Sequence, residues 1–479
     1  MKQYFTLPLI VVLAWLLGSC GGSDSTAGIE GTGSPVIATG AVTSFGSIYV
    51  NGERFVTRNA SVTLNGVAAS EDDIQAGMVV EIHGTTDPDS GDILAEKVIY
   101  ERSLLGRITA IERFETDALL ITLLGQNVYV AGDSVLDTES DALAVGDVVE
   151  ISGFLNNEGL FESTRLAPAD SLSPNEVVGK VTQLDEANQS FRLRNLTVDY
   201  RTATFSNGVV ADLQNTSQVK VQGSLSGENI LSATRISFQT PPVPEGTMRI
   251  LLEGIIDSYT DLSRFTVDNY IVDASGATLR GGTANQLQAG VRVTIDGTVD
   301  ANSNLRAERL RVHVSSRDKV RGTIEDIDVE NQTLTVLGTT FTLDELTAFE
   351  DRSIQGNRFI NLAELAVGDY VEVFSRNLDD ELLAVRVRRL NSSDLVTING
   401  SVSRVESNSL FFVMDVQVNG SDAEGAELIS SFTPGTRVQV EGTQTGSNAI
   451  QATRIQRLSE CKKLPGHHDC DAGDEQEED

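Results

Sequence analysis

Residues Gly77–Gly84 read GMVVEIHG, and close variants of this octet return four more times along the chain. The variants are GDVVEISG at Gly146, GVRVTIDG at Gly290, GDYVEVFS at Gly368 and GTRVQVEG at Gly435. Within each octet, aliphatic residues alternate with residues that are almost all polar. This alternation is typical of an antiparallel strand with one face on a core and the other face in water. We therefore expect a structural strand that recurs because each of several small domains builds its own core.

The octet is one part of a longer repeat. Each unit opens with a glycine beside β-branched residues, and these glycines recur at intervals of about 66 to 78 residues. The opening glycines are Gly40, Gly106, Gly179, Gly254, Gly322 and Gly400. Each unit closes with a strand such as LAEKV at Leu94 or QATRI at Gln451. The third unit keeps the octet strand as Gln218–Gly223 but lacks its leading glycine. With this unit included, the chain contains six units.

Each unit has room for five short strands and a linking segment before the fourth strand. This arrangement favours a small closed Greek-key barrel of the OB type, because closure leaves no exposed sheet edge. A β-propeller is the main rival, but its blades need only about 40 to 50 residues. We expect an all-β fold, a tandem array of six five-stranded OB-like barrels after a lipoprotein signal peptide. The expected segments are a signal peptide (1–19), a lipidated cysteine with a flexible tether (20–36), repeats 1 to 6 (37–102, 103–168, 176–239, 249–316, 318–391 and 395–458) and an acidic tail containing Cys and His (459–479).

The first residues have the composition of a secretory signal. Lys2 is followed by the apolar run Phe5–Leu17, which is too short to span a bilayer. The run ends in LGSC, which resembles the lipobox of bacterial lipoproteins. That resemblance implies that Cys20 becomes the lipidated first residue of the mature chain. The alternative is that Cys20 is a spare thiol near an ordinary cleavage site.

The C-terminal stretch CKKLPGHHDC stands outside the repeats. In an oxidising compartment, Cys461 and Cys470 most simply form a disulfide around a Pro-Gly turn. With His467 and His468 between them, the same four side chains are also a candidate Cys₂His₂ metal site. The residues that follow Cys470 are mostly acidic and should remain solvated.

A basic residue stands at one register of every final strand, in a chain whose formal net charge is −33. These residues are Lys97, Arg165, Arg235, Arg309, Arg386 and Arg454. One interpretation is a recurring structural cation that pairs across the sheet with acidic residues of the preceding strand, such as Glu81, Glu150 and Glu372. The other is a row of sites for carboxylate or phosphate groups, which the planar guanidinium fork recognises. Phe374 stands where the other units carry polar residues and is a candidate contact for a ligand or a neighbouring domain.

Enzyme chemistry has no sequence signature here. The chain contains no G-x-S-x-G elbow, no H-E-x-x-H pair and no Walker loop. His83 occupies a position on the expected solvent face, and His313 follows a final strand without a motif around it. Acidic turns such as Thr86–Asp92 resemble the start of a calcium loop, but turn chemistry accounts for them equally. We expect no catalytic residue and no cofactor, and the acidic composition disfavours nucleic acid as a partner.

Taken together, the pattern GxVxxI…LxVGDxVEVxG…LxAxRI resembles the bacterial repeat domain DUF5666, which is found in secreted proteins and lipoproteins. The resemblance extends from Ile37 to about Leu458 and implies no activity or ligand, because its motif consists of structural glycines and aliphatic residues. We expect a lipid-anchored, non-enzymatic protein of the bacterial cell envelope, at the outer membrane and facing the periplasm or the cell surface. Its role would be that of a spacer, scaffold or interaction array, with the membrane, through the lipid on Cys20, and envelope proteins or polysaccharide as partners. The alternative is a binding protein that presents a polysaccharide, a peptide or a divalent cation through its barrel faces.

Overall fold

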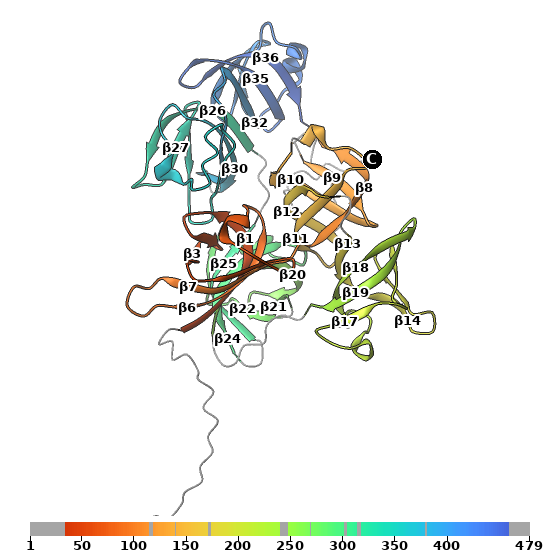
Figure 1. Ribbon diagram of the computed structural model, residues 1–479. Coiled ribbons are helices and arrows are strands. Elements are labelled where there is room, and N and C mark those ends of the chain that lie inside the picture. The colour runs from red at the N-terminus through yellow and green to blue at the C-terminus, as the bar shows by residue number, and fades with distance from the viewer. Residues whose placement is uncertain are drawn as a thin grey trace, which may run out of the picture. The chain divides into compact units, whose positions relative to one another are not determined.

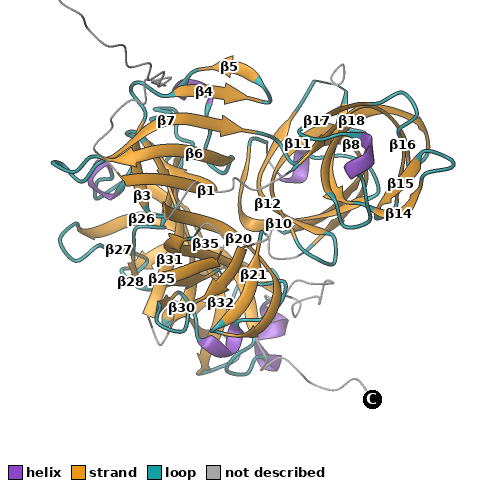
Figure 2. Ribbon diagram, turned by 90° about the horizontal axis from the view of Figure 1, so that it is seen from below, coloured by secondary structure: helices purple, strands orange, loops and turns teal. Residues whose placement is uncertain are grey.

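The structure is a computed structural model that describes residues 34–114, 118–138, 140–170, 174–239, 248–268, 270–300, 304–313, 318–378 and 381–458. These ranges contain 36 strands, six short 3₁₀ helices and no α-helix (Figures 1 and 2). The all-β expectation is confirmed. The expected signal peptide, the tether as far as Gly33, and the tail lie outside the described residues.

The first three repeats contain the following elements. Repeat 1 consists of β1 (Ser34–Ser44), β2 (Ile48–Val50), β3 (Glu53–Val56), β4 (Ser61–Leu64), β5 (Val67–Ala69), η1 (Glu71–Asp73), β6 (Val79–Thr86) and β7 (Ile93–Tyr100). Repeat 2 consists of β8 (Leu104–Arg113), β9 (Leu119–Leu123), β10 (Gln126–Leu136), η2 (Ser140–Ala142), β11 (Val148–Leu155) and β12 (Leu160–Pro168). Repeat 3 consists of β13 (Asn175–Lys180), β14 (Thr182–Asp185), β15 (Ser190–Leu193), β16 (Leu196–Asp199), β17 (Thr204–Ser206), η3 (Val210–Asp212), β18 (Gln218–Gly227) and β19 (Ile230–Phe238).

The last three repeats are built in the same way. Repeat 4 consists of β20 (Met248–Asp261), β21 (Arg264–Val267), β22 (Tyr270–Asp273), β23 (Thr278–Arg280), η4 (Ala284–Gln286), β24 (Arg292–Val299) and β25 (Asn304–Val312). Repeat 5 consists of β26 (Asp318–Asp328), β27 (Thr333–Val336), β28 (Thr339–Thr342), β29 (Ala348–Asp351), η5 (Leu362–Glu364), β30 (Tyr370–Leu378) and β31 (Glu381–Arg389). Repeat 6 consists of β32 (Leu395–Val405), β33 (Leu410–Val413), β34 (Val416–Asn419), η6 (Ala426–Ser431), β35 (Arg437–Gly446) and β36 (Ala449–Arg457).

Each repeat closes into a five-stranded barrel. In repeat 1, β1 pairs antiparallel with β2 and with β6, β2 pairs with β3, and β6 pairs with β7. The barrel closes because β3 runs parallel to β7, so the order is first, second, third, fifth, fourth and back to the first strand. The other five repeats follow the same scheme, with β13 and β14 together forming the first strand of repeat 3. This is the Greek-key barrel expected from the sequence, and a 3₁₀ turn precedes the fourth strand of every repeat.

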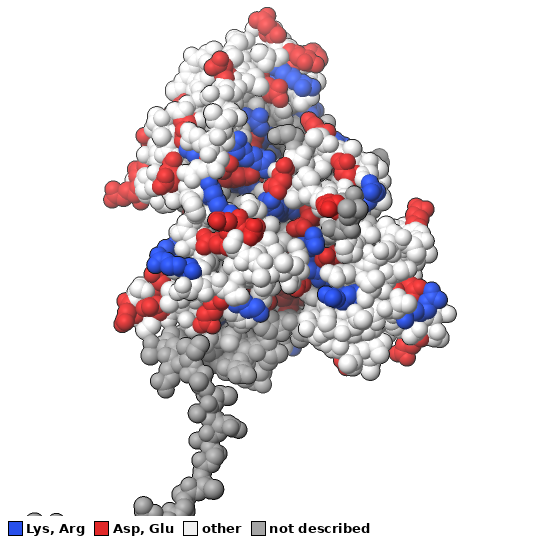
Figure 3. Space-filling view, in the orientation of Figure 1, with Lys and Arg blue, Asp and Glu red and all other residues white. Residues whose placement is uncertain are grey.

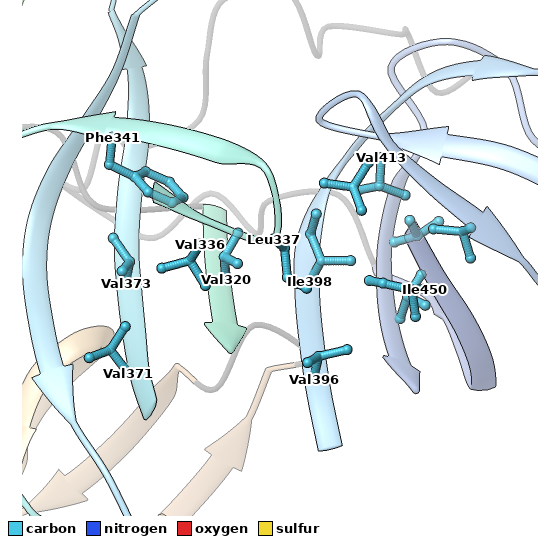
Figure 4. Packing of buried hydrophobic residues seen from close by; sticks show 14 of the residues in the cluster. Val320, Val336, Leu337, Phe341, Val371, Val373, Val396, Ile398, Val413 and Ile450 are labelled. Carbon is cyan, nitrogen blue, oxygen red and sulfur yellow. The ribbon is translucent and has the colours of Figure 1, made fainter. Parts of the chain in front are cut away.

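The aliphatic side of the recurring octet faces the barrel interior, as predicted. The residues on this side are Val80, Ile82, Val149, Ile151, Val219, Val221, Val293, Ile295, Val371, Val373, Val438 and Val440, and none is more than 1% exposed. In repeat 5, Val371 and Val373 belong to the same core as Val336 and Phe341 (Figure 4). The period-two alternation therefore identified the inward side correctly.

The prediction that the opposite side of the octet faces water is wrong for half of its positions. The buried residues on that side are Ser152, Lys220, Thr294, Asp296, Glu372 and Phe374. Long basic side chains from adjacent strands lie over this side, and other repeats contact it as well. For example, the backbone N–H of Val79 in repeat 1 donates to Ser152 Oγ in repeat 2 at 2.8 Å. The polar side is thus covered in part by side chains of its own repeat and in part by a neighbouring barrel.

The barrels join in pairs through the edges of their first strands. In repeats 1 and 4, β1 runs parallel to β20, with Ala38 opposite Leu251. In repeats 2 and 3, β8 pairs antiparallel with β13, and in repeats 5 and 6, β26 pairs antiparallel with β32. The described strands therefore form three large sheets, each shared by two barrels. Repeat 1 pairs with repeat 4, although two other repeats separate them in the sequence.

A β-bulge interrupts the pairing of the fourth and fifth strands at the same point in every repeat. Just past the bulge, the fourth strand has a small residue: Gly84, Gly153, Gly223, Gly297, Ser375 and Gly442. A Cβ atom on Gly153 would lie 2.1 Å from the carbonyl oxygen of Glu162 on the opposite strand, and a Cβ on Gly297 would lie 2.2 Å from that of Arg306. This close approach explains the glycine that ends four of the five octets first seen in the sequence.

The glycine that begins the octet is required for a different reason, its backbone conformation. Gly77, Gly146, Gly290, Gly368 and Gly435 all have a positive φ, a conformation that favours glycine. In repeat 3 the equivalent residue is Thr216, which has φ +80°. Its N–H donates to Val181 O at 2.7 Å, just as Gly77 N–H donates to Val42 O at 2.8 Å. Repeat 3 has therefore kept the turn without the glycine, and the β-branched Thr216 is strained in this conformation.

We expect Thr216→Gly to stabilise repeat 3 by about 1 kcal/mol, because relief of the left-handed strain exceeds the entropic cost of a glycine. The Thr216 side chain is exposed, so no packing is lost. Native-state hydrogen exchange at β18 would measure the effect. The control is Gln214→Gly at an exposed position without a positive φ, where we expect a small loss of stability. A loss of stability in both variants would contradict the strain at Thr216.

Candidate functional site

The six recurring cations do not share one environment. Arg165 and Arg386 are buried, whereas Lys97, Arg235, Arg309 and Arg454 are exposed. Arg165 forms an ion pair with Asp137, and its Nη1 donates to Ala76 O of repeat 1 at 3.1 Å. Arg309 binds Asp296 at 2.6 Å. The same register thus serves contacts between barrels in some repeats and faces solvent in others.

The strand register corrects the expected partners of these cations. They lie opposite His83, Ser152, Gln222, Asp296, Phe374 and Glu441. Glu81, Glu150 and Glu372, which were expected to be the partners, lie two residues away and face Ile99, Ala167 and Arg388. The predicted pairing was wrong because the turn between the two strands and the bulge set the register, and neither follows from the alternation pattern.

Repeat 5 gathers charged side chains on the outer side of its sheet, over β26 and β30 (Figure 3). Glu372 on β30 accepts hydrogen bonds from Arg321 Nε at 3.0 Å and from Arg388 Nη1 at 2.8 Å, and Lys319 Nζ lies 3.9 Å away. Glu372 is only 2% exposed. Burial opposes its ionisation, but the three cations outweigh burial and lower the pKa of Glu372. Phe374 is also buried on this side, with the Arg388 guanidinium 5.2 Å from its ring centroid, so it is not an exposed binding residue.

Glu350 on β29 is a second shared carboxylate in repeat 5. Its oxygens lie 2.5 Å from Arg352 Nε, 2.9 Å from Arg388 Nε and 3.7 Å from Arg386 Nη1. Burial would raise the pKa of Glu350, but the positive charges of Arg388, Arg386 and Arg352 hold it at about 2. One carboxylate thus serves three arginines, and Arg386 is the most distant of them.

The low pKa of Glu350 predicts a pH dependence of stability. Because the folded pKa of about 2 lies below the ordinary value of 4.5, its stabilising contribution is complete above pH 4.5 and is lost as the pH falls towards 2. Thermal unfolding of the wild type and of Glu350→Gln should therefore differ most above pH 4.5 and converge near pH 2. Parallel curves across this range would contradict an ionised, stabilising Glu350.

Buried or half-buried ion pairs also connect repeats 2 and 3. Arg102 Nη1 lies 2.8 Å from Glu150 of repeat 2, and its Nη2 lies 3.0 Å from Glu176 of repeat 3. Lys220 Nζ lies 3.4 Å from the other oxygen of Glu176. Burial works against the charge of Arg102, but Glu176 and Glu150 outweigh it and raise its pKa. This cluster joins the two barrels beside their shared strands.

Repeats 1 and 4 are joined in a similar way. Arg249 of repeat 4 binds Asp296 in its own repeat through Nε at 2.9 Å and Glu53 of repeat 1 through Nη2 at 2.6 Å. The hydrogen bonds to Asp296 and Glu53 raise the pKa of Arg249. In the opposite direction, Ala41 N–H of repeat 1 donates to Glu253 Oε2 of repeat 4 at 2.7 Å. In repeats 5 and 6, Arg437 Nη1 lies 2.6 Å from Asp318. All three barrel pairs thus combine strand pairing with charged contacts.

The segment that follows β29 in repeat 5 docks on repeat 1. Arg358 donates to the carbonyl oxygens of Glu71, Asp72 and Ile74, which surround the 3₁₀ helix η1. Its guanidinium also lies 4.2 Å from the ring centroid of Phe45. Arg358 is therefore the main polar link between these two repeats, and no sequence motif marked it.

Arg358→Lys should loosen this link, because an ammonium group cannot hold three carbonyl groups and an aromatic face at once. We expect a loss of about 1 to 2 kcal/mol, seen as faster amide exchange in η1 and the residues after it. Arg404→Lys is the control, since Arg404 lies over Phe412 within repeat 6 and is exposed. Unchanged exchange around η1 in Arg358→Lys would contradict the docking role.

A cavity of about 580 Å³ opens where residues of repeats 1, 2, 4 and 5 meet. Its ionisable lining residues include four arginines, four carboxylates and one histidine: Arg292, Arg311, Arg376, Arg386, Asp133, Glu162, Glu253, Asp344 and His313. Sequence reasoning had singled out Arg386 as a recurring cation and had found no motif around His313. The other residues were missed because they come from separate repeats, and the pairing of repeat 1 with repeat 4 cannot be inferred from local patterns.

Three arginines act electrostatically on His313, which lines the cavity. Burial and the charges of Arg292, Arg311 and Arg376 lower the pKa of His313 well below its ordinary value, so His313 is neutral. Burial and the nearby Arg376 lower the pKa of Arg311 to about 10. His83, by contrast, lies on the outer side of repeat 1, where its Nε2 is 2.5 Å from Glu81.

Several predicted site residues lie outside the described residues. These are Cys20, Cys461, His467, His468 and Cys470. Within the described ranges, no group of three or more His, Cys, Asp or Glu side chains is arranged to hold a metal ion. None of the helices in these ranges is long and apolar enough to cross a membrane.

Comparisons with known proteins identify the repeat. No curated protein matches the chain. Four chains of solved structures match; one, described as "drosophila Unr CSD456", is 15% identical, with 44% of this chain and 96% of that chain covered and a TM-score of 0.12. The family model described as "Domain of unknown function (DUF5666)" matches residues 39–99, 106–166, 178–237, 253–311, 321–388 and 399–456, which together make up most of the chain. The chain therefore belongs to the DUF5666 family, with six copies of the domain in tandem.

Proposed function

We propose that the protein is a non-enzymatic scaffold of the bacterial cell envelope, anchored by a lipid on Cys20. The observation that carries this proposal is the fusion of the barrels in pairs through shared sheets. If the barrels were independent, the first half of each first strand would be paired on one side only. The other side would be a free edge, and free edges invite pairing with other chains. Here each first strand is paired on both sides, which suits a protein that holds its surfaces at fixed positions.

The charged contacts between barrels support the same role. Buried ion pairs are a weak source of stability but require defined geometry, because each charge needs its partner. Arg102 and Arg249 each contact carboxylates from two repeats. Such contacts favour one arrangement of the barrels over many. The lipobox-like residues before Cys20 support lipid attachment. Gly21, which stands after Cys20 in place of Asp, supports the outer membrane as its site, with the barrels facing the periplasm or the cell surface.

Two experiments on the full chain in a bacterial host test this proposal. Cys20→Ala should abolish the incorporation of labelled fatty acid and release the protein from the outer-membrane fraction. In cells with the wild type, chemical crosslinking should recover envelope proteins, and the cavity-filling variant Asn285→Trp should recover the same set. Loss of the crosslinks on filling the cavity would contradict a scaffold whose outer surfaces make the contacts.

The second candidate is a binding protein for a polysaccharide, a peptide or a divalent cation. The observation that favours it is the cavity between repeats, whose volume lies within the range of about 300 to 1,000 Å³ typical of small-molecule sites. The ligand would then be held between barrels and not on their faces.

A further inference from the structure

The six barrels form two halves, repeats 1 to 3 and repeats 4 to 6, which are joined once along the chain, between β19 and β20. Repeats 2 and 3 share one hydrophobic core, and repeats 5 and 6 share another. Repeats 1 and 4 belong to different halves and have separate cores, although β1 and β20 are paired. Among the described residues, Leu251 alone belongs to a core cluster of the other half. Repeats 1 and 4 can therefore separate without splitting a shared core.

Polar contacts accompany the strand pairing between these two repeats. Asn51 Nδ2 of repeat 1 donates to Leu251 O of repeat 4 at 3.0 Å. Glu53 of repeat 1 lies 2.6 Å from Arg249 Nη2 and 3.0 Å from Arg309 Nη2 of repeat 4. The side chains of Glu53 and Arg249 are each 29% exposed, so water reaches this ion pair. We call β1 and β20, with Asn51, Glu53 and Arg249 beside them, the joint. Polar interfaces of this kind between domains resemble those of transient complexes.

A second copy of the chain offers the same joint. Its β20 and Arg249 have the same structure as those that repeat 1 already contacts within its own chain. The contacts would therefore be equally favourable within one chain and between two chains, which is the basis of domain swapping. The closed chain is favoured by the effective concentration of its linked halves, about 1 mM for a short flexible connection. Pairing between copies becomes competitive when the protein is concentrated or when the joint within each chain is weakened.

We propose that the halves exchange between two copies of this chain, so that repeats 1 to 3 of one copy bind repeats 4 to 6 of the other. The exchanged dimer contains two joints, and in each of them β1 of one chain pairs with β20 of the other. The shared cores of repeats 2 and 3 and of repeats 5 and 6 stay intact within each half. This inference goes beyond the scaffold role and does not depend on it.

Two variants with opposite charge changes test the exchange. Arg249→Glu places an acidic group beside Glu53, and Glu53→Arg places a basic group beside Arg249, so each chain alone has a mismatched joint. In an exchanged dimer of the two variants, one joint is that of the wild type and the other pairs the two new charges. Both chains also carry Cys20→Ala, so that no lipid holds them together.

The measurement is native mass spectrometry of the two full chains after mixing, with one of them isotope-labelled. We expect the mixture to contain at least about tenfold more dimer than either variant alone, because like charges at an interface are strongly disfavoured. Dimer that is no more abundant in the mixture would overturn the exchange. The same holds if each variant alone forms as much dimer as the mixture, because an ordinary surface contact would then explain it.

Arg306→Glu is the matched control. It makes the same charge change in repeat 4, but at an exposed residue of β25 whose charge acts on Asp273. Mixed with Glu53→Arg, it leaves one joint of the exchanged dimer mismatched, so it should give no more dimer than Glu53→Arg alone. Tenfold more dimer in this control mixture would overturn the assignment of the contact to the joint.

The wild type supplies a test that does not depend on the folding of the charge variants. Labelled and unlabelled wild-type chains, again with Cys20→Ala, should form mixed dimers when they are incubated together at about 1 mM. The proportion of mixed dimers should fall when the incubation is repeated at a hundredfold lower concentration. Absence of mixed dimers at the higher concentration would overturn the exchange.

Discussion

Glu372→Gln is expected to lower the stability of repeats 5 and 6 by about 4 kcal/mol, because it removes the shared negative charge from a buried cluster of cations. Arg321, Arg388 and Lys319 all contact this carboxylate. Without it, the cations repel one another in a site from which water is largely excluded. Native-state hydrogen exchange at β26 and β30 is the suitable measurement, since a chain of six barrels need not unfold in one step.

The chain supplies two controls for this substitution. Glu81 occupies the same position of the octet in repeat 1 but is about one-third exposed and contacts His83, so Glu81→Gln should cost less than about 0.5 kcal/mol. Gln439 is the natural residue at this position in repeat 6, which shows that glutamine itself suits the strand. Equal losses in Glu372→Gln and Glu81→Gln would mean that the charge cluster in repeat 5 contributes nothing specific.

The barrel itself was predictable because its main signals are local. The alternation at Val371 and Val373 identifies the inward side of the fourth strand without any knowledge of its neighbours. Five strands and a linking segment then limit the fold to few closed arrangements. The sequence also showed that repeat 3 lacks the leading glycine of the octet. The positive φ of Thr216, which replaces that glycine, became apparent only in the structure.

The ion pairs of the final-strand cations and the cavity between repeats were not predictable to the same extent. The partner of Arg165 or Arg386 depends on the register across a turn and a bulge, and a shift of two residues changes every pair. The cavity depends on a contact between strands that are far apart in the sequence, the pairing of β1 with β20. Residues such as Arg311 and Asp344 meet only because different repeats come together. Periodicity within one repeat contains no information about such contacts.

Gly297→Ala is expected to destabilise repeat 4 by about 2 to 3 kcal/mol, as overpacking against a rigid backbone does. The added methyl group would lie 2.2 Å from Arg306 O and 2.9 Å from the Cα of Ala307, both in the backbone of the opposite strand. Relief requires the two strands to separate at the bulge, next to the ion pairs of Asp296. Hydrogen exchange at β24 and β25 would measure the loss.

Two other positions separate the effect of this contact from that of glycine in general. Gly276→Ala adds the same methyl group in repeat 4, where nothing lies within 4 Å, so it should be neutral or slightly stabilising. Repeat 5 carries Ser375 at the position of Gly297, with the same bulge and the same alanine opposite, so its strands already accommodate a Cβ atom. Ser375→Gly should therefore change stability by less than Gly297→Ala does. If Gly297→Ala proved as harmless as Gly276→Ala, the recurring glycine at the end of the octet would not be a steric requirement. The small residue would then have to serve the contacts between barrels instead.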